Sequence, residues 1–219
     1  MLEARNISFG YPGAARPLYE SFSLSVGSGE RVALSAPSGF GKTTLCRVLA
    51  GYEQPQRGEV FVGGVPLPKR GACPVQMILQ HPETAVDPRM RMAATLEEAR
   101  GAFEGLTAAV RNGADPSPEA LRLMEGLGIK RQWLTRFPHE LSGGELQRFC
   151  VARALAANPR YLIADEISTM LDAVTQAQIW GFLLKELELR GVGLVFVSHS
   201  AALAERIATR VVDLTQLGR

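Results

Sequence analysis

The chain has 219 residues, of which 46% are hydrophobic, enough for one substantial core with a smaller sub-domain. Its 24 basic and 22 acidic residues nearly cancel, which excludes the strong charge field of a protein that binds nucleic acid or an anionic lipid surface. No apolar run approaches the roughly 20 residues that span a bilayer, and the first five residues do not have the pattern of a signal peptide.

A glycine-rich loop is the first motif along the chain. Short strands and hairpins are expected over residues 1–79, where the apolar run 32–34 leads into the loop and a helical stretch follows at 45–50. Strand, loop and helix are the context of the phosphate-binding pattern G-x-x-x-x-G-K-[ST]. We call this segment the phosphate loop; it comprises Ser35, Ala36, Pro37, Ser38, Gly39, Phe40, Gly41, Lys42, Thr43 and Thr44.

The phosphate loop predicts how a nucleotide is held. Backbone N–H groups would surround the β-phosphate, Lys42 would reach the β- and γ-phosphates, and Thr43 would ligate Mg²⁺. Ala36 stands where the pattern has its first glycine, and its methyl group costs about 1 kcal/mol only if the backbone there needs a positive φ. The chain's cysteines lack metal-ligand spacing, so reduced thiols are expected, with Cys46 and Cys150 in the core.

The middle of the chain, residues 81–158, has a helical pattern. It follows a strand and turn at 57–64 and an apolar strand at 75–79 that ends in Gln80. Helices are expected at 93–103, 119–127 and 145–157, with a loop at 112–118. Ser142 and Glu145 have the spacing of a capping box at the start of the third helix. Between them, Gly143 and Gly144 let backbone N–H groups approach an anion at the positive end of that helix.

Strands and helices alternate from residue 159 on, as a parallel sheet requires. The apolar strand 161–164 ends in adjacent carboxylates, Asp165 and Glu166, which we call the acidic pair. A second apolar strand, 193–198, ends at His199. On the helix expected after Asp172, five residues recur at 3.6-residue spacing and are expected to pack in the core: Ala173, Ala177, Trp180, Leu184 and Leu187.

In this order the motifs resemble those of the ATP-binding cassette (ABC) family, and the resemblance runs from Tyr11 to His199. Residues 141–145, Leu-Ser-Gly-Gly-Glu, resemble the family's signature, 161–166 its Walker B strand, and 168–172, Ser-Thr-Met-Leu-Asp, its D-loop. The resemblance implies an α/β P-loop NTPase with a mainly parallel sheet core, an antiparallel β subdomain and an inserted helical subdomain. It divides the single domain 1–219 into a nucleotide-binding core, 1–80 and 159–219, and a helical subdomain with the signature, 81–158.

The resemblance also implies a role for each site residue. Gln80 matches the Q-loop glutamine, which contacts Mg²⁺ and the attacking water, and His199 matches the switch histidine at the γ-phosphate. Asp165 would hold Mg²⁺ through its waters, and Glu166 would be the general base. Tyr11 matches the aromatic residue that stacks on adenine. The residues that would serve the ATP of a partner subunit are Ser142, Gly143, Gly144, Glu145 and Asp172.

Two positions depart from the family pattern. Phe40 stands where the family mostly carries a small residue, and it is expected to point outward because ATP occupies the inside of the loop. Met170 replaces the usual alanine of the D-loop and is interpreted as a packing variant.

The resemblance further implies a task. Cassettes of this family form a head-to-tail dimer that ATP closes and hydrolysis reopens, and the insert between Gln80 and Leu141 has the length found in transporter cassettes, where it grips a permease. Residues 80–90 and 171–180 are similar to the peptide/nickel importer branch. The expected protein is therefore a peripheral ATPase on the cytoplasmic face of the cell membrane, using ATP and Mg²⁺. Its partners would be a second ABC ATPase subunit, identical or homologous, transmembrane permease subunits and an extracytoplasmic solute-binding protein, with no nucleic acid.

The cargo and two alternatives stay open at this level. The sequence stops soon after His199, without the extension that many peptide importers carry, so dipeptides, oligopeptides, nickel and a metal chelate all fit. A soluble ABC ATPase of DNA repair or translation is one alternative, although it would carry a long coiled coil or two cassettes. A regulatory cassette that does not hydrolyse ATP is the other, motivated by Ala36 and Phe40. The intact residues that oppose it are Lys42, Asp165, Glu166 and His199.

Overall fold

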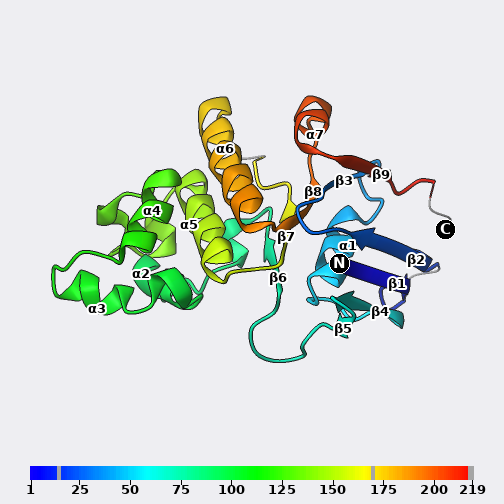
Figure 1. Cartoon of the computed structure of the whole chain (residues 1–219), viewed down its shortest axis with the longest axis horizontal. Coiled ribbons are helices and arrows are strands. Elements are labelled where there is room, and N and C mark those ends of the chain that lie inside the picture. The colour runs from blue at the N-terminus through cyan, green and yellow to red at the C-terminus, as the bar shows by residue number, and fades with distance from the viewer. Residues whose placement is uncertain (14–15, 169–170, 217–219) are drawn as a thin grey trace. The chain divides into compact units, whose positions relative to one another are not determined.

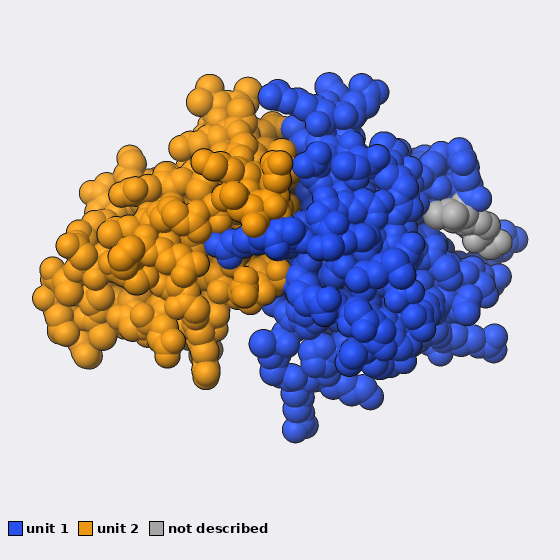
Figure 2. Space-filling view, in the orientation of Figure 1, with its two compact units in different colours: residues 1–77, 160–166, 190–219 blue, residues 78–159, 167–189 orange. Residues whose placement is uncertain are grey.

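The computed structural model describes residues 1–13, 16–168 and 171–216 (Figure 1). They form two compact units (Figure 2). The first comprises residues 1–77, 160–166 and 190–219, and the second residues 78–159 and 167–189. Residues 167–189 thus group with the helices, whereas the division drawn from the sequence placed them in the nucleotide-binding core.

The first unit contains an antiparallel sheet of four strands in the order β2-β1-β4-β5. These strands are β1 (Leu2–Phe9), β2 (Tyr19–Val26), β4 (Arg57–Val62) and β5 (Val65–Pro66). Buried and exposed residues largely alternate along β2, the period of a strand with one face in the core. The strand and turn expected at 57–64 are confirmed as β4 and the turn that leads into β5.

A second sheet has the order β6-β7-β8-β3-β9, and β3 pairs in parallel with β8 and β9, as β7 does with β8. Its strands are β3 (Arg31–Ser35), β6 (Val75–Ile78), β7 (Tyr161–Asp165), β8 (Gly193–Val197) and β9 (Arg210–Asp213). Every residue of β7 and β8 is buried, which explains their continuous apolar runs. The carboxyl ends of β3, β7 and β8 share one edge, the edge where parallel sheets place ligands.

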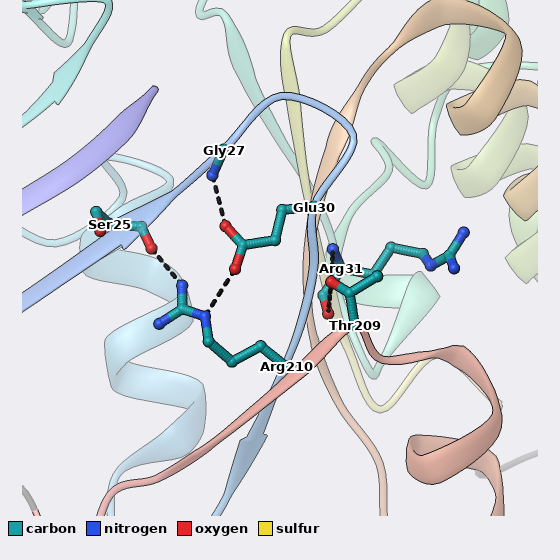
Figure 3. A network of polar contacts seen from close by, with 6 residues as sticks. All are labelled: Ser25, Gly27, Glu30, Arg31, Thr209 and Arg210. Atoms are coloured by element: carbon teal, nitrogen blue, oxygen red, sulfur yellow. Dashed lines mark hydrogen bonds and ion pairs between the residues drawn. The ribbon is translucent and has the colours of Figure 1, made fainter.

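Polar contacts join the amino ends of β3 and β9 to the carboxyl end of β2 (Figure 3). Glu30 accepts hydrogen bonds from Arg210 Nε at 2.7 Å and from the Gly27 amide at 2.7 Å, and Arg210 also donates to the Ser25 carbonyl. The Arg31 amide donates to the Thr209 hydroxyl at 2.9 Å. The starts of β3 and β9 are thereby tied to each other and to the end of β2, within the first unit.

The second unit is helical. It holds α2 (Met92–Glu97), α3 (Leu106–Arg111), α4 (Pro118–Gly126), α5 (Gly143–Ala156) and most of α6 (Ala173–Arg190). Short 3₁₀ turns lie at Pro82–Thr84, Gly101–Phe103, Arg131–Trp133 and Pro138–Glu140. The first unit adds α1 (Lys42–Leu49) and α7 (Ala201–Ile207). Cys46 and Cys150 are buried on α1 and α5, as expected. Among the described residues, no helix has the length and apolar character needed to cross a membrane.

Two expected helical patterns were wrong. The helix expected at 93–103 ends as α2 at Glu97, because Arg100 and Gly101 adopt φ of 57° and 53°, which a right-handed helix cannot continue. The Glu97 carboxylate then accepts the amides of Gly105 and Thr107 and so begins α3, which the sequence did not predict.

The buried face of α6 also differs from the expected one. Trp180 and Leu187 are buried, but Ala173 and Ala177 are exposed and Leu184 is only half-buried. The buried residues of α6 are Ile179, Trp180, Leu183, Glu186 and Leu187. A charged residue lies on this face because Arg122 of α4 forms a bidentate ion pair with Glu186.

Candidate nucleotide site

The phosphate loop connects β3 to α1, and Gly41 sets its shape. Gly41 is the N-cap of α1 with φ of 93°, and a Cβ atom there would lie 2.6 Å from Leu18 Cδ2 and 2.9 Å from the Tyr19 hydroxyl. Only glycine satisfies both the backbone and the space. Ala36, by contrast, does not adopt a positive φ, so alanine at the first glycine position costs little. Phe40 is half-buried, and its carbonyl accepts the Tyr19 hydroxyl at 3.4 Å.

Lys42 lies over its own loop. Its ammonium group donates to the carbonyl oxygens of Ala36 at 2.8 Å and Pro37 at 3.2 Å. These oxygens hold the charged end of the side chain near the loop backbone. The acceptors of the lysine in this structure are thus neutral carbonyl oxygens of its own loop.

Asp165 ends β7 and is almost fully buried, with 1% of its surface exposed. Burial raises the pKa of this carboxyl group; the Glu166 charge adds to the rise and a hydrogen bond from Thr43 opposes it. Within the described part of the chain, Asp165 Oδ1 has no hydrogen-bond partner. A buried carboxylate oxygen without a partner beside a threonine hydroxyl is a donor set of the hard oxygens that Mg²⁺ prefers, so the residues fit this ion.

Glu166 leaves the strand in a strained conformation. Its φ is 50°, in the left-handed region that non-glycine residues rarely adopt, and its amide donates to the Val197 carbonyl at 3.2 Å. His199 Nε2 lies 2.8 Å from Glu166 Oε1. Glu166 is 8% exposed, whereas more than half of the His199 side chain reaches solvent. The pair thus connects a buried acid at the end of β7 to an exposed imidazole after β8.

Tyr11 stands at the opening of the site. Its hydroxyl lies 3.0 Å from Thr44 Oγ1, and its ring meets Phe9 edge to face at 5.2 Å between centroids. A cavity of about 510 Å³ is lined by Tyr11, Leu18, Ser38, Gly39, Gly41, Lys42, Thr43, Thr44, Glu166 and His199. Most residues that the sequence assigned to ATP within one subunit therefore line one cavity of the first unit. Leu18 could not be predicted from the sequence, because only the position of β2 brings it beside Gly41.

The signature segment, residues 141–145, belongs to the second unit and begins α5. The capping box is present: the Ser142 amide donates to Glu145 Oε2 at 2.8 Å and the Glu145 amide to the Ser142 hydroxyl at 3.3 Å. A cavity of about 670 Å³ is lined by Gly128, Lys130, Trp133, Ser142, Gly143, Gly144, Glu145, Arg148, Leu171, Asp172, Thr175 and Gln178. Five of its members were predicted as site residues: Ser142, Gly143, Gly144, Glu145 and Asp172. The others were not, because only the packing of α4, α5 and α6 brings them to this cavity.

Asp172 and Gln80 also lie in the second unit. Asp172 Oδ1 accepts the Val174 amide at 3.0 Å and the Thr175 amide at 2.9 Å, and these hydrogen bonds hold the pKa of Asp172 below its usual value. Gln80 is half-buried after β6, where the Leu79 carbonyl accepts Gln147 Nε2 at 3.4 Å. Met170 of the D-loop, with Thr169, lies outside the described residues.

Comparison with known proteins identifies the family. The family described as ABC transporter matches residues 19–169. This chain belongs to it. The cassette is 37% identical over 204 residues to the nickel import ATP-binding protein NikE of Brucella abortus (strain 2308), covering 90% of this chain and 75% of that protein. It is 35% identical to the glutathione import ATP-binding protein GsiA of Escherichia coli O6:H1, covering 88% of this chain but 31% of GsiA.

Solved structures agree with this assignment. The dimeric post-hydrolysis state of the ATP-binding cassette MJ0796, bound to ADP and Pi, matches with a TM-score of 0.81 and 25% identity over 97% of this chain and 94% of that chain. The fold expected from the resemblance is therefore confirmed, as is the resemblance to the nickel and peptide importer branch. The chain is an ATP-binding ABC cassette and an ATPase.

Proposed function

We propose that this cassette is the ATP-hydrolysing subunit of a membrane importer for nickel or peptides. The observation that carries the proposal is the cavity at the carboxyl ends of β3, β7 and β8, in a chain whose relatives are named for nickel and glutathione import. The cavity brings together Lys42, Thr43, Glu166 and His199. A cassette without hydrolysis would have no need to keep this set of side chains intact.

In the proposed mechanism the chain's own residues prepare the nucleotide site. Lys42 exchanges the carbonyls of Ala36 and Pro37 for β- and γ-phosphate oxygens, while Tyr11 supports adenine. Asp165 and Thr43 would supply the oxygens for Mg²⁺, which when bound would neutralise charge on the phosphates. Burial of the Asp165 carboxylate would then be less unfavourable.

Glu166 acts as the general base. It takes a proton from the water that attacks the γ-phosphate, so that the products are ADP and inorganic phosphate. His199 already holds Glu166 Oε1 at 2.8 Å and would orient this carboxylate until its imidazole turns to the γ-phosphate. The fixed backbone of Glu166, bonded to the Val197 carbonyl, keeps the carboxylate at the end of the sheet.

The second half of each site comes from another subunit in this proposal. Ser142 and the amides at the start of α5 would close on the γ-phosphate of ATP held by a second ATPase chain, with Asp172 beside them. Gln80 would respond to Mg²⁺ and water and move the surface that holds a membrane permease. The cassette would thus lie on the cytoplasmic face of the membrane, and a solute-binding protein would deliver the cargo from outside.

Uptake of nickel and of a peptide by a strain that lacks this chain tests the proposed importer function. Loss of this chain should abolish accumulation of labelled nickel or of a labelled peptide, and the wild-type chain should restore it. Glu166→Gln should not restore it, because turnover falls by roughly 10²- to 10⁴-fold while ATP still binds. Gln80→Ala should lower uptake more than ATP binding. The importer function would be contradicted if the deletion strain took up both cargoes normally and the chain were absent from the membrane fractions of the wild-type strain. The assignment as an ATPase would then still hold.

A further inference from the structure

Arg148, on the turn of α5 after the signature, contacts three residues on two other helices of the second unit. Its Nη1 donates to the Leu127 carbonyl, at the end of α4, and to Gln178 Oε1 at 3.2 Å, and its Nη2 lies 3.4 Å from the Thr175 hydroxyl. Thr175 and Gln178 lie on the first turns of α6. One guanidinium group therefore joins α5 to both α4 and α6.

The end of α4 is shaped to admit this side chain. Gly128 follows the C-cap residue Leu127 with φ of 65°, and a Cβ atom there would lie 2.7 Å from Arg148 Nη1 and 3.3 Å from Gln178 Nε2. A residue other than glycine would be strained in this backbone and would also displace the guanidinium. The backbone carbonyl at the negative end of a helix is a good acceptor for a cation.

Further contacts bring the signature and the D-loop to the same place. The amides of Val174 and Thr175 are held by Asp172, and a Cβ atom at Gly144 would lie 3.1 Å from Leu171 Cδ2. Thr175 therefore receives the Arg148 guanidinium on its side chain while Asp172 holds its amide. Except for Val174, these residues line the 670 Å³ cavity of the second unit.

Arg153, on the same helix, is a useful comparison because its contacts lie away from the signature. It pairs with the Glu98 carboxylate at 3.1 Å and donates to the Ala85 carbonyl. Arg148 differs in two ways. Its three acceptors are neutral, and two of them belong to Thr175 and Gln178, which line the same cavity as Ser142 and Asp172. Its positive charge thus stays beside the residues that approach an anion.

We propose that Arg148 is a positioning residue that joins the signature helix α5 to the D-loop helix α6, so that Ser142 and Asp172 approach a partner's ATP as one body. This role rests on the proposed function for its effect on turnover. The junction itself does not depend on that function, because its contacts lie within one chain. Lysine cannot replace arginine, since one ammonium cannot reach three acceptors in the same fork.

The test compares Arg148→Lys with Arg153→Lys. In steady-state ATPase assays of the full-length chain, assembled with its permease, Arg148→Lys should lower kcat by roughly 10²-fold, because the signature would be misplaced at the partner's ATP, and bring the Hill coefficient for ATP toward one. ATP affinity of the isolated chain should stay within about twofold, because the phosphate loop is in the other unit. Arg153→Lys should change kcat by less than about twofold. Equal kcat losses in the two variants, at equal thermal stability, would overturn the proposal.

A second measurement, amide hydrogen exchange, does not depend on ATP turnover. Amide hydrogen exchange at residues 173–178 should rise in Arg148→Lys but not in Arg153→Lys. Gln178→Leu should give the same rise, and the double variant with Arg148→Lys should add little to either single change. Additive effects of Arg148→Lys and Gln178→Leu on exchange, or equal exchange in the two arginine variants, would contradict the proposal that Arg148 joins α5 to α6. If the wild-type chain lacked ATPase activity but the exchange pattern held, the proposed function would fail and the junction would stand.

Discussion

At the scale of single residues, burial disfavours the charged form of the Asp165 carboxyl group when no nucleotide or metal ion is bound. Its carboxylate is buried, one oxygen lacks a partner among the described residues, and the charge of Glu166 lies next to it. Such a group destabilises the fold when ionised. Its pKa is raised in the folded state, so stability is lost as pH rises through that pKa, and the cost is present at neutral pH.

Asp165→Asn should therefore stabilise the chain without nucleotide and Mg²⁺. The expected gain in the free energy of unfolding at pH 7 is roughly 1 to 3 kcal/mol, shrinking toward acid pH. Mg²⁺-ATP should stabilise this variant less than the wild type. Thermal unfolding with and without Mg²⁺-ATP measures both effects.

Asp172 is a control for which the opposite effect on stability is expected, because its pKa is lowered rather than raised. Its pKa is lowered by hydrogen bonds from the amides of Thr175 and Val174, so its charge is favoured in the folded state. Asp172→Asn should reduce stability at pH 7, and this loss should disappear as pH falls through the lowered pKa. If both substitutions shifted stability in the same direction, burial would not explain the behaviour of Asp165.

At the scale of elements, the start of α1 depends on Gly41. Gly41→Ala should weaken both folding and ATP binding, because the new methyl group meets Leu18 and Tyr19 as well as an unfavourable φ. Gly29→Ala is the matched control, since Gly29 has φ of 69° but no atom within 4 Å of its added Cβ. Gly29→Ala should cost about 1 kcal/mol, and Gly41→Ala distinctly more. Equal losses in urea unfolding would mean that the contacts at Gly41 relax without cost.

The junction of β2, β3 and β9 predicts a pH dependence. Burial raises the pKa of Glu30, but hydrogen bonds from Arg210 and Gly27 and the charge of Arg210 outweigh it, so the pKa is lowered below 4.5. The pair's contribution is thus present above pH 4.5 and is lost as pH falls through the lowered pKa.

Glu30→Gln should lower the melting temperature near pH 7, and the difference from wild type should shrink below pH 4.5. Glu59→Gln, at an exposed position of β4, is the control and should have little effect at either pH. A constant difference between Glu30→Gln and wild type from pH 7 to pH 3.5 would show that the charge of Glu30 is not what stabilises the junction.

At the scale of the whole molecule, the candidate residues divide between two compact units. The phosphate loop, the acidic pair and His199 belong to the first, and the signature, Asp172 and Gln80 to the second. If the second set serves a partner's ATP, its substitution should leave nucleotide binding by a single chain unchanged. The two sets therefore predict opposite phenotypes.

Lys42→Ala should weaken ATP binding by the isolated chain, because it removes the cation over the loop. Ser142→Arg should leave that affinity within about twofold but block ATP-dependent dimer formation, since it adds bulk and charge at the N-cap of α5. Equilibrium ATP binding and size-exclusion chromatography with light scattering separate the two outcomes. Equal losses of affinity in both isolated variants would mean that the signature acts within its own chain.

The motifs and most helices and strands could be predicted from the sequence, because their signals are local. The glycine positions of the phosphate loop, the capping box of Ser142 and Glu145 and the apolar strands β7 and β8 follow from neighbouring residues. The local pattern did not predict which face of α6 is buried, because two series of apolar residues overlap there. It also did not predict where α2 ends, because the positive φ of Arg100 leaves no signal in the residue pattern.

Contacts between residues that are distant along the chain could not be predicted and are known only from the folded structure. The place of Leu18 beside Gly41 depends on β2, and the pairing of Glu166 with His199 depends on two adjacent strands ending at one edge. The reach of Arg148 to α4 and α6 depends on how three helices pack. Periodicity and spacing along the chain carry no information about such contacts, because strand register and helix packing are set by the core as a whole.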